Sequence, residues 1–170
     1  LHLEGQLQEI FDQMSEEKTV FAAAEVLDEN KLLEDAEDAS LNDPHVWFDI
    51  LLWKEVVEGI GDTLVEEYPE HKVTFENNEE TYLAKLDELA AFAKERVAEV
   101  PKEQRILVTA HDAFNYFGES LGFEVSGLQG LSTEAEYGVK DVENMVNYLV
   151  DNNIKAIFVE SSVSDKAMQA

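Results

Sequence analysis

Apolar residues recur at steps of three and four positions in four segments of the chain, a spacing that predicts amphipathic α-helices. These segments are residues 1–15, 46–68, 77–100 and 139–150. The third is the strongest prediction, because the helix-favouring residues Glu, Lys and Ala fill the positions between its apolar residues. At about 1.5 Å per residue this helix is on the order of 35–40 Å long if Phe75 also belongs to it, and Pro101 ends it.

Short apolar runs predict buried strands at four other places. They are residues 19–24, 106–108, 123–127 and 156–159. The last three alternate with predicted helices at residues 113–117 and 139–150, an order that is typical of a parallel sheet. Residues 25–42 are acidic and poorly patterned, which predicts an irregular excursion over the surface. The pattern as a whole predicts an α/β fold.

Composition and charge narrow the classes of partner. The 170 residues are 45% hydrophobic, enough for a core, and they include 38 Asp and Glu against 12 Lys and Arg, for a net charge of -26. A surface of that charge repels nucleic acid and anionic membranes. The chain has no cysteine, which excludes disulfides, thiolate metal sites and cysteine nucleophiles.

The sequence contains no run that is long and apolar enough to span a bilayer, and no signal peptide. It begins with LHLEG, without an initiator Met, and it stops within a segment that is predicted to start a helix. We therefore expect both ends to continue in a longer protein.

Two of the four histidines, His45 and His111, are candidates for chemistry. Each precedes an aromatic-rich helical segment, and they lie on opposite sides of the long predicted helix. His111 also follows a strand, at whose carboxyl end α/β folds place their ligands. Imidazole suits Zn, Mn or Fe, so one histidine from each half can bind a shared ion; the alternative for His111 is a solvent-facing loop. We expect His2 and His71 at the surface, and Asp112 as a cap of the helix that follows it.

Four segments, in order along the chain, carry a resemblance to one protein family. They are DPHVWFD at residues 43–49, LVTAHDAFNYFG at 107–118, GLQGLSTEAEYG at 127–138 and IKAIFVESSVS at 154–164. These segments resemble signatures of the metal-binding solute-binding proteins of ABC transporters, the manganese, zinc and iron group. The resemblance implies two α/β lobes with mainly parallel sheets flanked by helices, joined by one long helix, with the N-terminal lobe incomplete in this chain.

The same resemblance implies a division of the chain and a function. The division is a partial N-terminal lobe at 1–74, a linking helix at 75–100 and a partial C-terminal lobe at 101–170; from the pattern alone, a long core helix in a single domain is the alternative. The implied function is an extracytoplasmic receptor, in the periplasm or at the cell surface, whose only attachment to the membrane is a lipid anchor outside this chain. It captures a divalent transition metal, Zn, Mn or Fe, and delivers it to an ABC permease.

The family's ligands fall on two residues of this chain. His45, within DPH, takes the place of the second ligand, and His111 takes that of the third. We expect the first ligand before Leu1 and the fourth beyond Ala170, so that the chain carries half of the ligand set. Zinc and manganese both stay open as the cargo.

Residues near the two histidines can assist metal binding, and two other functions are alternatives to metal transport. Four acids are candidates for orienting a ligand imidazole: Asp112, Glu134, Glu136 and Glu160. Trp47 and Phe114 are expected in the core. A metal-dependent hydrolase, with zinc on the two histidines and Glu160 as general base, is one alternative, although the chain has no HExxH motif. A cell-surface adhesion module is the other.

Overall fold

The computed structural model describes residues 7–35, 40–129 and 139–159. The chain divides into two compact units, Leu1–Arg96 and Val97–Ala170. Within the described ranges, none of the helices has both the length and the apolar composition needed to cross a membrane. The boundary between the units falls near the end of the long helix, and the role of that helix as a link between lobes stays a prediction.

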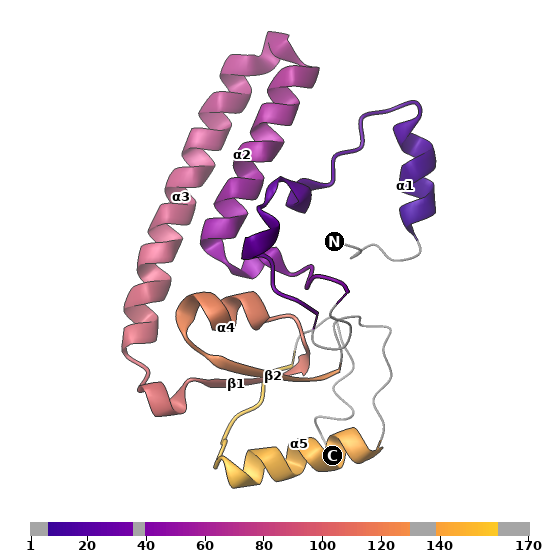
Figure 1. Ribbon diagram of the computed structural model, residues 1–170. Coiled ribbons are helices and arrows are strands. Elements are labelled where there is room, and N and C mark those ends of the chain that lie inside the picture. Colours follow the sequence, from indigo (N-terminus) through magenta and orange to yellow (C-terminus); the bar gives the residue numbers. More distant parts are fainter. Residues whose placement is uncertain (1–6, 36–39, 130–138, 160–170) are drawn as a thin grey trace. The chain divides into compact units, whose positions relative to one another are not determined.

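Two long helices, α2 (Ile50–Glu67) and α3 (Lys72–Ala98), make up most of the first unit. They run side by side in opposite directions and are joined by a short 3-10 helix, η5 (Pro69–His71) (Figure 1). α3 begins five residues earlier than the pattern predicts, and an ion pair of 3.0 Å between Lys72 and Glu76 supports its first turn. Its 27 residues correspond to a length of about 40 Å.

α2 begins later than predicted, because the helical conformation is interrupted at Asp49. Val46–Phe48 form a separate 3-10 helix, η4, and Asp49 is extended, with φ -98° and ψ 112°. The Asp49 carboxylate accepts hydrogen bonds from the backbone N–H groups of Leu51 and Leu52, at 2.8 and 3.3 Å. This N-cap starts the helix, so the single predicted helix is two elements, and His45 directly precedes the first of them.

Polar contacts connect α2 to α3, and the unit also has a small apolar core. The indole N–H of Trp53 donates to the hydroxyl oxygen of Tyr82 at 3.2 Å, and Lys54 forms an ion pair with Asp87. Among the described residues of this unit, the buried apolar side chains are those of Leu27, Val46, Leu52, Val56 and Leu86.

The segments before α2 are short and irregular. The predicted first helix is confirmed over its described part as α1 (Gln8–Ser15), which buries none of its side chains. Further along, η3 (Glu29–Lys31) and an isolated bridge between Glu34 and Asn42 are the regular features of the acidic segment. Most of the described residues of this segment are exposed, as predicted, whereas Leu27 is buried.

The predicted strand at residues 19–24 is wrong. Residues 19–22 have no regular structure, and the alanines that follow enter a 3-10 helix, η2 (Ala23–Val26). A strand needs a neighbour that accepts its backbone hydrogen bonds, and the described part of the first unit contains no strand to pair with it. Val20 and Phe21 are accordingly exposed.

In the second unit, a strand, a helix and a parallel strand follow the 3-10 helix η6 (Lys102–Gln104), as the pattern predicts. They are β1 (Ile106–His111), α4 (Asn115–Leu121) and β2 (Glu124–Gln129). Thr109 pairs with Gly127 across the two strands. Of β1, Val108 and Ala110 are buried, together with Ala113 and Tyr116 beyond it.

The third predicted strand, at residues 156–159, is reduced to a single parallel bridge between Thr109 and Phe158. The Phe158 N–H donates to the carbonyl of Val108 at 2.8 Å, and the Ala110 N–H donates back to the carbonyl of Phe158 at 3.1 Å. The predicted parallel direction of this segment is therefore correct, and its neighbour is β1, although it is too short to count as a strand.

Helix α5 (Val139–Asp151) contacts β2 and lies on the side of the strands opposite to α4 (Figure 1). The hydroxyl of Tyr148 donates to the Glu124 carboxylate at 2.5 Å. Burial and this hydrogen bond raise the pKa of Tyr148 to about 12.

Candidate metal-binding site

The Asp43-Pro44-His45 turn positions the first predicted ligand. The Asp43 carboxylate oxygen Oδ1 accepts a hydrogen bond from the backbone N–H of His45 at 2.9 Å and lies 2.7 Å from the ring atom Nδ1 of the same residue. Both residues are buried, with exposed fractions of 0% for Asp43 and 3% for His45. The imidazole of His45 is thus held in one orientation inside the first unit.

Neighbouring groups fix the turn itself. The Asp43 N–H donates to the carbonyl of Leu33 at 2.9 Å, and the Val46 N–H donates to that of Pro44 at 2.9 Å. The ring of Trp47 meets the His45 ring edge to face, at 5.2 Å between centroids and 73° between planes. Trp47 was predicted in the core, but it is 38% exposed, because it follows the buried His45 on a 3-10 turn at the surface of the unit.

Asp43 is the acid that the sequence analysis missed among the partners of a ligand histidine. It stands two residues before His45, which is the spacing at which an Asp side chain accepts the backbone N–H two positions on. The intervening proline restricts Asp43 to extended conformations. The two-residue spacing and the intervening proline are therefore the features of the DPH segment from which the contact between Asp43 and His45 could have been predicted.

His111 is the last residue of β1 and is 8% exposed. Its carbonyl accepts hydrogen bonds from the Thr109 hydroxyl at 2.8 Å and from the Ala113 N–H at 3.1 Å. These two hydrogen bonds stabilise the turn that follows the strand at His111. The alternative of a solvent-facing loop histidine is wrong, because the ring is buried at the carboxyl end of a parallel strand.

Asp112 does not cap the helix that follows it. α4 begins three residues later, after Phe114, and no side chain caps it. Instead, the backbone of Asp112 lies against Gly127 of β2: a Cβ atom at position 127 would be 2.6 Å from the Asp112 Cα. Phe114, predicted in the core, is only half-buried.

The remaining candidates lie elsewhere. His71 is exposed as predicted, with its Nε2 atom 3.8 Å from a carboxylate oxygen of Glu70 and a ring contact to Phe75. His2, Glu134, Glu136 and Glu160 lie outside the described residues. Across the described ranges, no three His, Asp or Glu side chains gather closely enough to share a metal ion.

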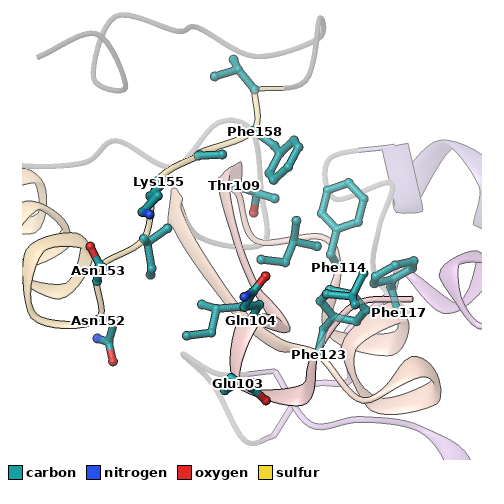
Figure 2. A pocket seen from close by; sticks show the side chains of 16 residues that line it. Glu103, Gln104, Thr109, Phe114, Phe117, Phe123, Asn152, Asn153, Lys155 and Phe158 are labelled. Carbon is teal, nitrogen blue, oxygen red and sulfur yellow. The ribbon is translucent and has the colours of Figure 1, made fainter. Parts of the chain in front are cut away.

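The second unit also contains an apolar hollow of about 970 Å³ beside β1. Three phenylalanines, Phe114, Phe117 and Phe123, gather on one side of it, and Asn152 and Asn153 lie on the opposite side (Figure 2). His111 is not among the described residues that line it, and its only described carboxylate is that of Glu103. Such a lining offers no set of metal ligands, so the hollow is separate from the candidate metal site.

Comparison with known proteins assigns the chain to a family. The sequence model of the family described as "Zinc-uptake complex component A periplasmic" (ZnuA) matches residues 1–170. The manganese-binding lipoprotein MntA of Bacillus subtilis is 44% identical over 170 residues, and the zinc-binding protein TroA of Treponema pallidum is 37% identical over 170 residues. The match covers the whole chain but 55% and 54% of those relatives, so the chain spans about half of their length.

Solved structures agree with this assignment. The periplasmic zinc-binding protein TroA of Treponema pallidum matches with a TM-score of 0.95 at 36% identity, over 99% of this chain and 60% of that one. Fe(III)-bound YtgA of Chlamydia trachomatis matches with a TM-score of 0.73 at 26% identity, over 82% and 52%. The likeness to TroA confirms the predicted α/β class, that of two-lobed proteins joined by a long helix. The chain therefore belongs to the family of metal-binding solute-binding proteins of ABC transporters, whose model describes the periplasmic component A of a zinc-uptake complex.

Proposed function

We propose that this chain is part of an extracytoplasmic solute-binding protein, which captures a divalent transition metal ion between two lobes and delivers it to an ABC permease. In this proposal residues 1–74 belong to the N-terminal lobe, 75–100 form the linking helix, and 101–170 belong to the C-terminal lobe. His45 and His111 each contribute one nitrogen ligand to the same ion.

The observation that carries the proposal is one buried histidine in each unit. His45 and His111 are 3% and 8% exposed, whereas His71 is exposed. Histidine is intermediate in its tendency to be buried, and a neutral imidazole held in a fixed orientation is a good ligand for first-row divalent ions. Family membership makes metal capture the purpose that best explains two such residues.

The cargo follows from ligand chemistry and from the names of relatives. The relatives include a manganese-binding and a zinc-binding protein, and one structure holds Fe(III). Imidazole nitrogen binds zinc more tightly than manganese or ferrous iron, but the metal that is available often decides which one a site carries. We therefore propose zinc or manganese as the cargo, with iron as a third candidate.

The names of relatives also support a cellular location for the protein, and coordination chemistry supports the absence of catalysis. The name of MntA marks it as a lipoprotein and that of TroA as periplasmic, which supports a place outside the cytoplasm and an anchor beyond this chain. Capture and release only exchange coordination bonds, so we expect no catalytic turnover.

Metal titration of the complete polypeptide that its gene encodes tests the proposal. Affinities for Zn²⁺ and Mn²⁺ are measured by competition with a chelator for the wild type, His45→Ala and His111→Ala. A zinc site of about four ligands contributes roughly 10–16 kcal/mol, so removal of one ligand is expected to weaken binding by about 100-fold or more. His71→Ala is the control, because this histidine is exposed, and it leaves the affinity unchanged. Unchanged affinity in both His45→Ala and His111→Ala would reject these residues as ligands.

A further inference from the structure

We infer that Asp43 is a positioning residue for metal capture: its buried carboxylate holds the His45 ring with the proton on Nδ1, and so turns Nε2 toward the ion. This inference rests on the proposed function and deepens it. It adds to the site a residue that contacts the ligand histidine rather than the metal.

The first step of the argument concerns the proton. The Asp43 Oδ1 atom lies 2.7 Å from Nδ1 of His45, which is within hydrogen-bond distance. An ionised carboxylate only accepts hydrogen bonds, so in a neutral ring the proton of this bond belongs to Nδ1. The lone pair that can bind a metal ion is then on Nε2.

The second step concerns orientation. The same Oδ1 atom also accepts the His45 backbone N–H at 2.9 Å, so one oxygen holds both the main chain and the ring of the residue. The Trp47 ring packs edge to face against the His45 ring, with 5.2 Å between the two ring centroids. A ring held by a short hydrogen bond and an aromatic neighbour has little rotational freedom left to lose when an ion binds.

The third step concerns charge. The Asp43 side chain is 0% exposed, and a buried carboxylate is stable only where hydrogen bonds or positive charge compensate it. A divalent ion on Nε2 makes the ring more positive, and this strengthens the hydrogen bond from Nδ1 to Asp43. The carboxylate therefore stabilises the metal-bound state more than the empty state, and its removal is expected to lower metal affinity by about 10–100-fold.

A measurement on the wild-type polypeptide tests the tautomer without any substitution. Long-range ¹H–¹⁵N NMR spectra of the metal-free protein are recorded at about pH 8.5, above the pKa of histidine in model peptides. The resonances of His45 are assigned by their loss in His45→Ala. We expect the proton of His45 on Nδ1. A proton on Nε2 would overturn the inference.

A pair of variants tests the effect on affinity. Asp43→Ala removes the carboxylate that accepts the Nδ1 proton, and without this acceptor the ring is expected to take the tautomer with the proton on Nε2. The expected results are an about 10–100-fold loss of Zn²⁺ and Mn²⁺ affinity and a shift of the His45 proton to Nε2. The control is Asp49→Asn, because asparagine is as good an N-cap for α2 as aspartate, and it leaves both readouts unchanged.

The outcomes separate this inference from the proposed function. If the wild type binds metal and His45→Ala loses affinity, but Asp43→Ala keeps both the affinity and the Nδ1–H tautomer, the inference is wrong and the proposed function stands. If His45→Ala and His111→Ala keep the wild-type affinity, the proposed function itself fails. A loss of affinity in Asp43→Ala with an unchanged tautomer would also contradict the inference, because a purely structural role predicts that combination.

Discussion

At the scale of single residues, close backbone approaches fix where the second candidate ligand lies. The backbone of Asp112, directly after His111, lies against Gly127, where a Cβ atom would come within 2.6–2.7 Å of three Asp112 atoms, two of them in the backbone. The only side chain that fits such an approach is a hydrogen atom, so β2 can lie this close to the end of β1 only because residue 127 is glycine.

Gly127→Ala is therefore expected to displace the turn that carries His111. Overpacking of this kind lowers the free energy of unfolding by about 1–3 kcal/mol, and the shifted turn weakens metal binding. Urea unfolding of the variant and a metal titration measure the two effects.

Gly61→Ala provides the comparison. Its new Cβ atom meets only the end of the Glu79 side chain, which can swing away, and alanine is a better helix former than glycine by about 1 kcal/mol. We expect this variant to be as stable as the wild type or more stable. A Gly127→Ala protein that is no less stable than Gly61→Ala would refute the close approach.

Residue types and neighbours predicted which histidines are buried, but not all of their contacts. His45 and His111 were chosen because each precedes an aromatic segment, and both are buried. The partnership of Asp43 with His45 was missed, because acids farther along the chain were weighed and the local two-residue spacing was not. Asp112 was wrongly expected to cap α4, because sequence alone does not show that three residues separate it from the helix.

At the scale of elements, negative charge gathers where α2 and α3 lie side by side. Glu79 of α3 is partly buried over Gly61 of α2. Burial, and then the negative charges of Asp62, Glu58 and Glu76, raise the pKa of Glu79 above its ordinary value of 4.5. Because the pKa is higher in the folded than in the unfolded state, the free energy of unfolding falls as the pH rises from about 4.5 through the folded-state pKa.

Glu79→Gln is expected to stabilise the protein at pH 7 by about 0.5 kcal/mol, because it removes like-charge repulsion of a few tenths of a kcal/mol per neighbour. The gain disappears in acid, below pH 4.5, where Glu79 of the wild type is itself protonated. Urea unfolding at several pH values measures it. Glu80→Gln removes the same charge from an exposed position of α3 and gives a smaller change. A gain that is equal for both variants, or independent of pH, would contradict the role of this cluster.

The helices and the parallel pair of strands could be predicted because their signals are local. Helical spacing and helix-favouring residues predicted α2, α3 and α5, with errors of a few residues where caps and ion pairs set the ends, as at Asp49 and Lys72. The false strand at 19–24 has a different cause. A short apolar run has the same pattern whether or not a partner strand is present, and only tertiary structure provides the partner.

At the scale of the whole molecule, the account depends on two units that each contribute one ligand. The division at Arg96 and Val97 places His45 in the first unit and His111 in the second. The sequence predicted the α/β class and the family through four ordered segments. The convergence of the two histidines on one ion stays a prediction, because it depends on contacts between residues far apart in the chain.

A crystal structure of the complete polypeptide with bound zinc or manganese, with the ion located by anomalous scattering, tests this central claim most directly. The account predicts one ion at about 2.0–2.2 Å from Nε2 of His45 and at a similar distance from a ring nitrogen of His111. An ion bound by one of these rings without the other, or held elsewhere in the molecule, would contradict it.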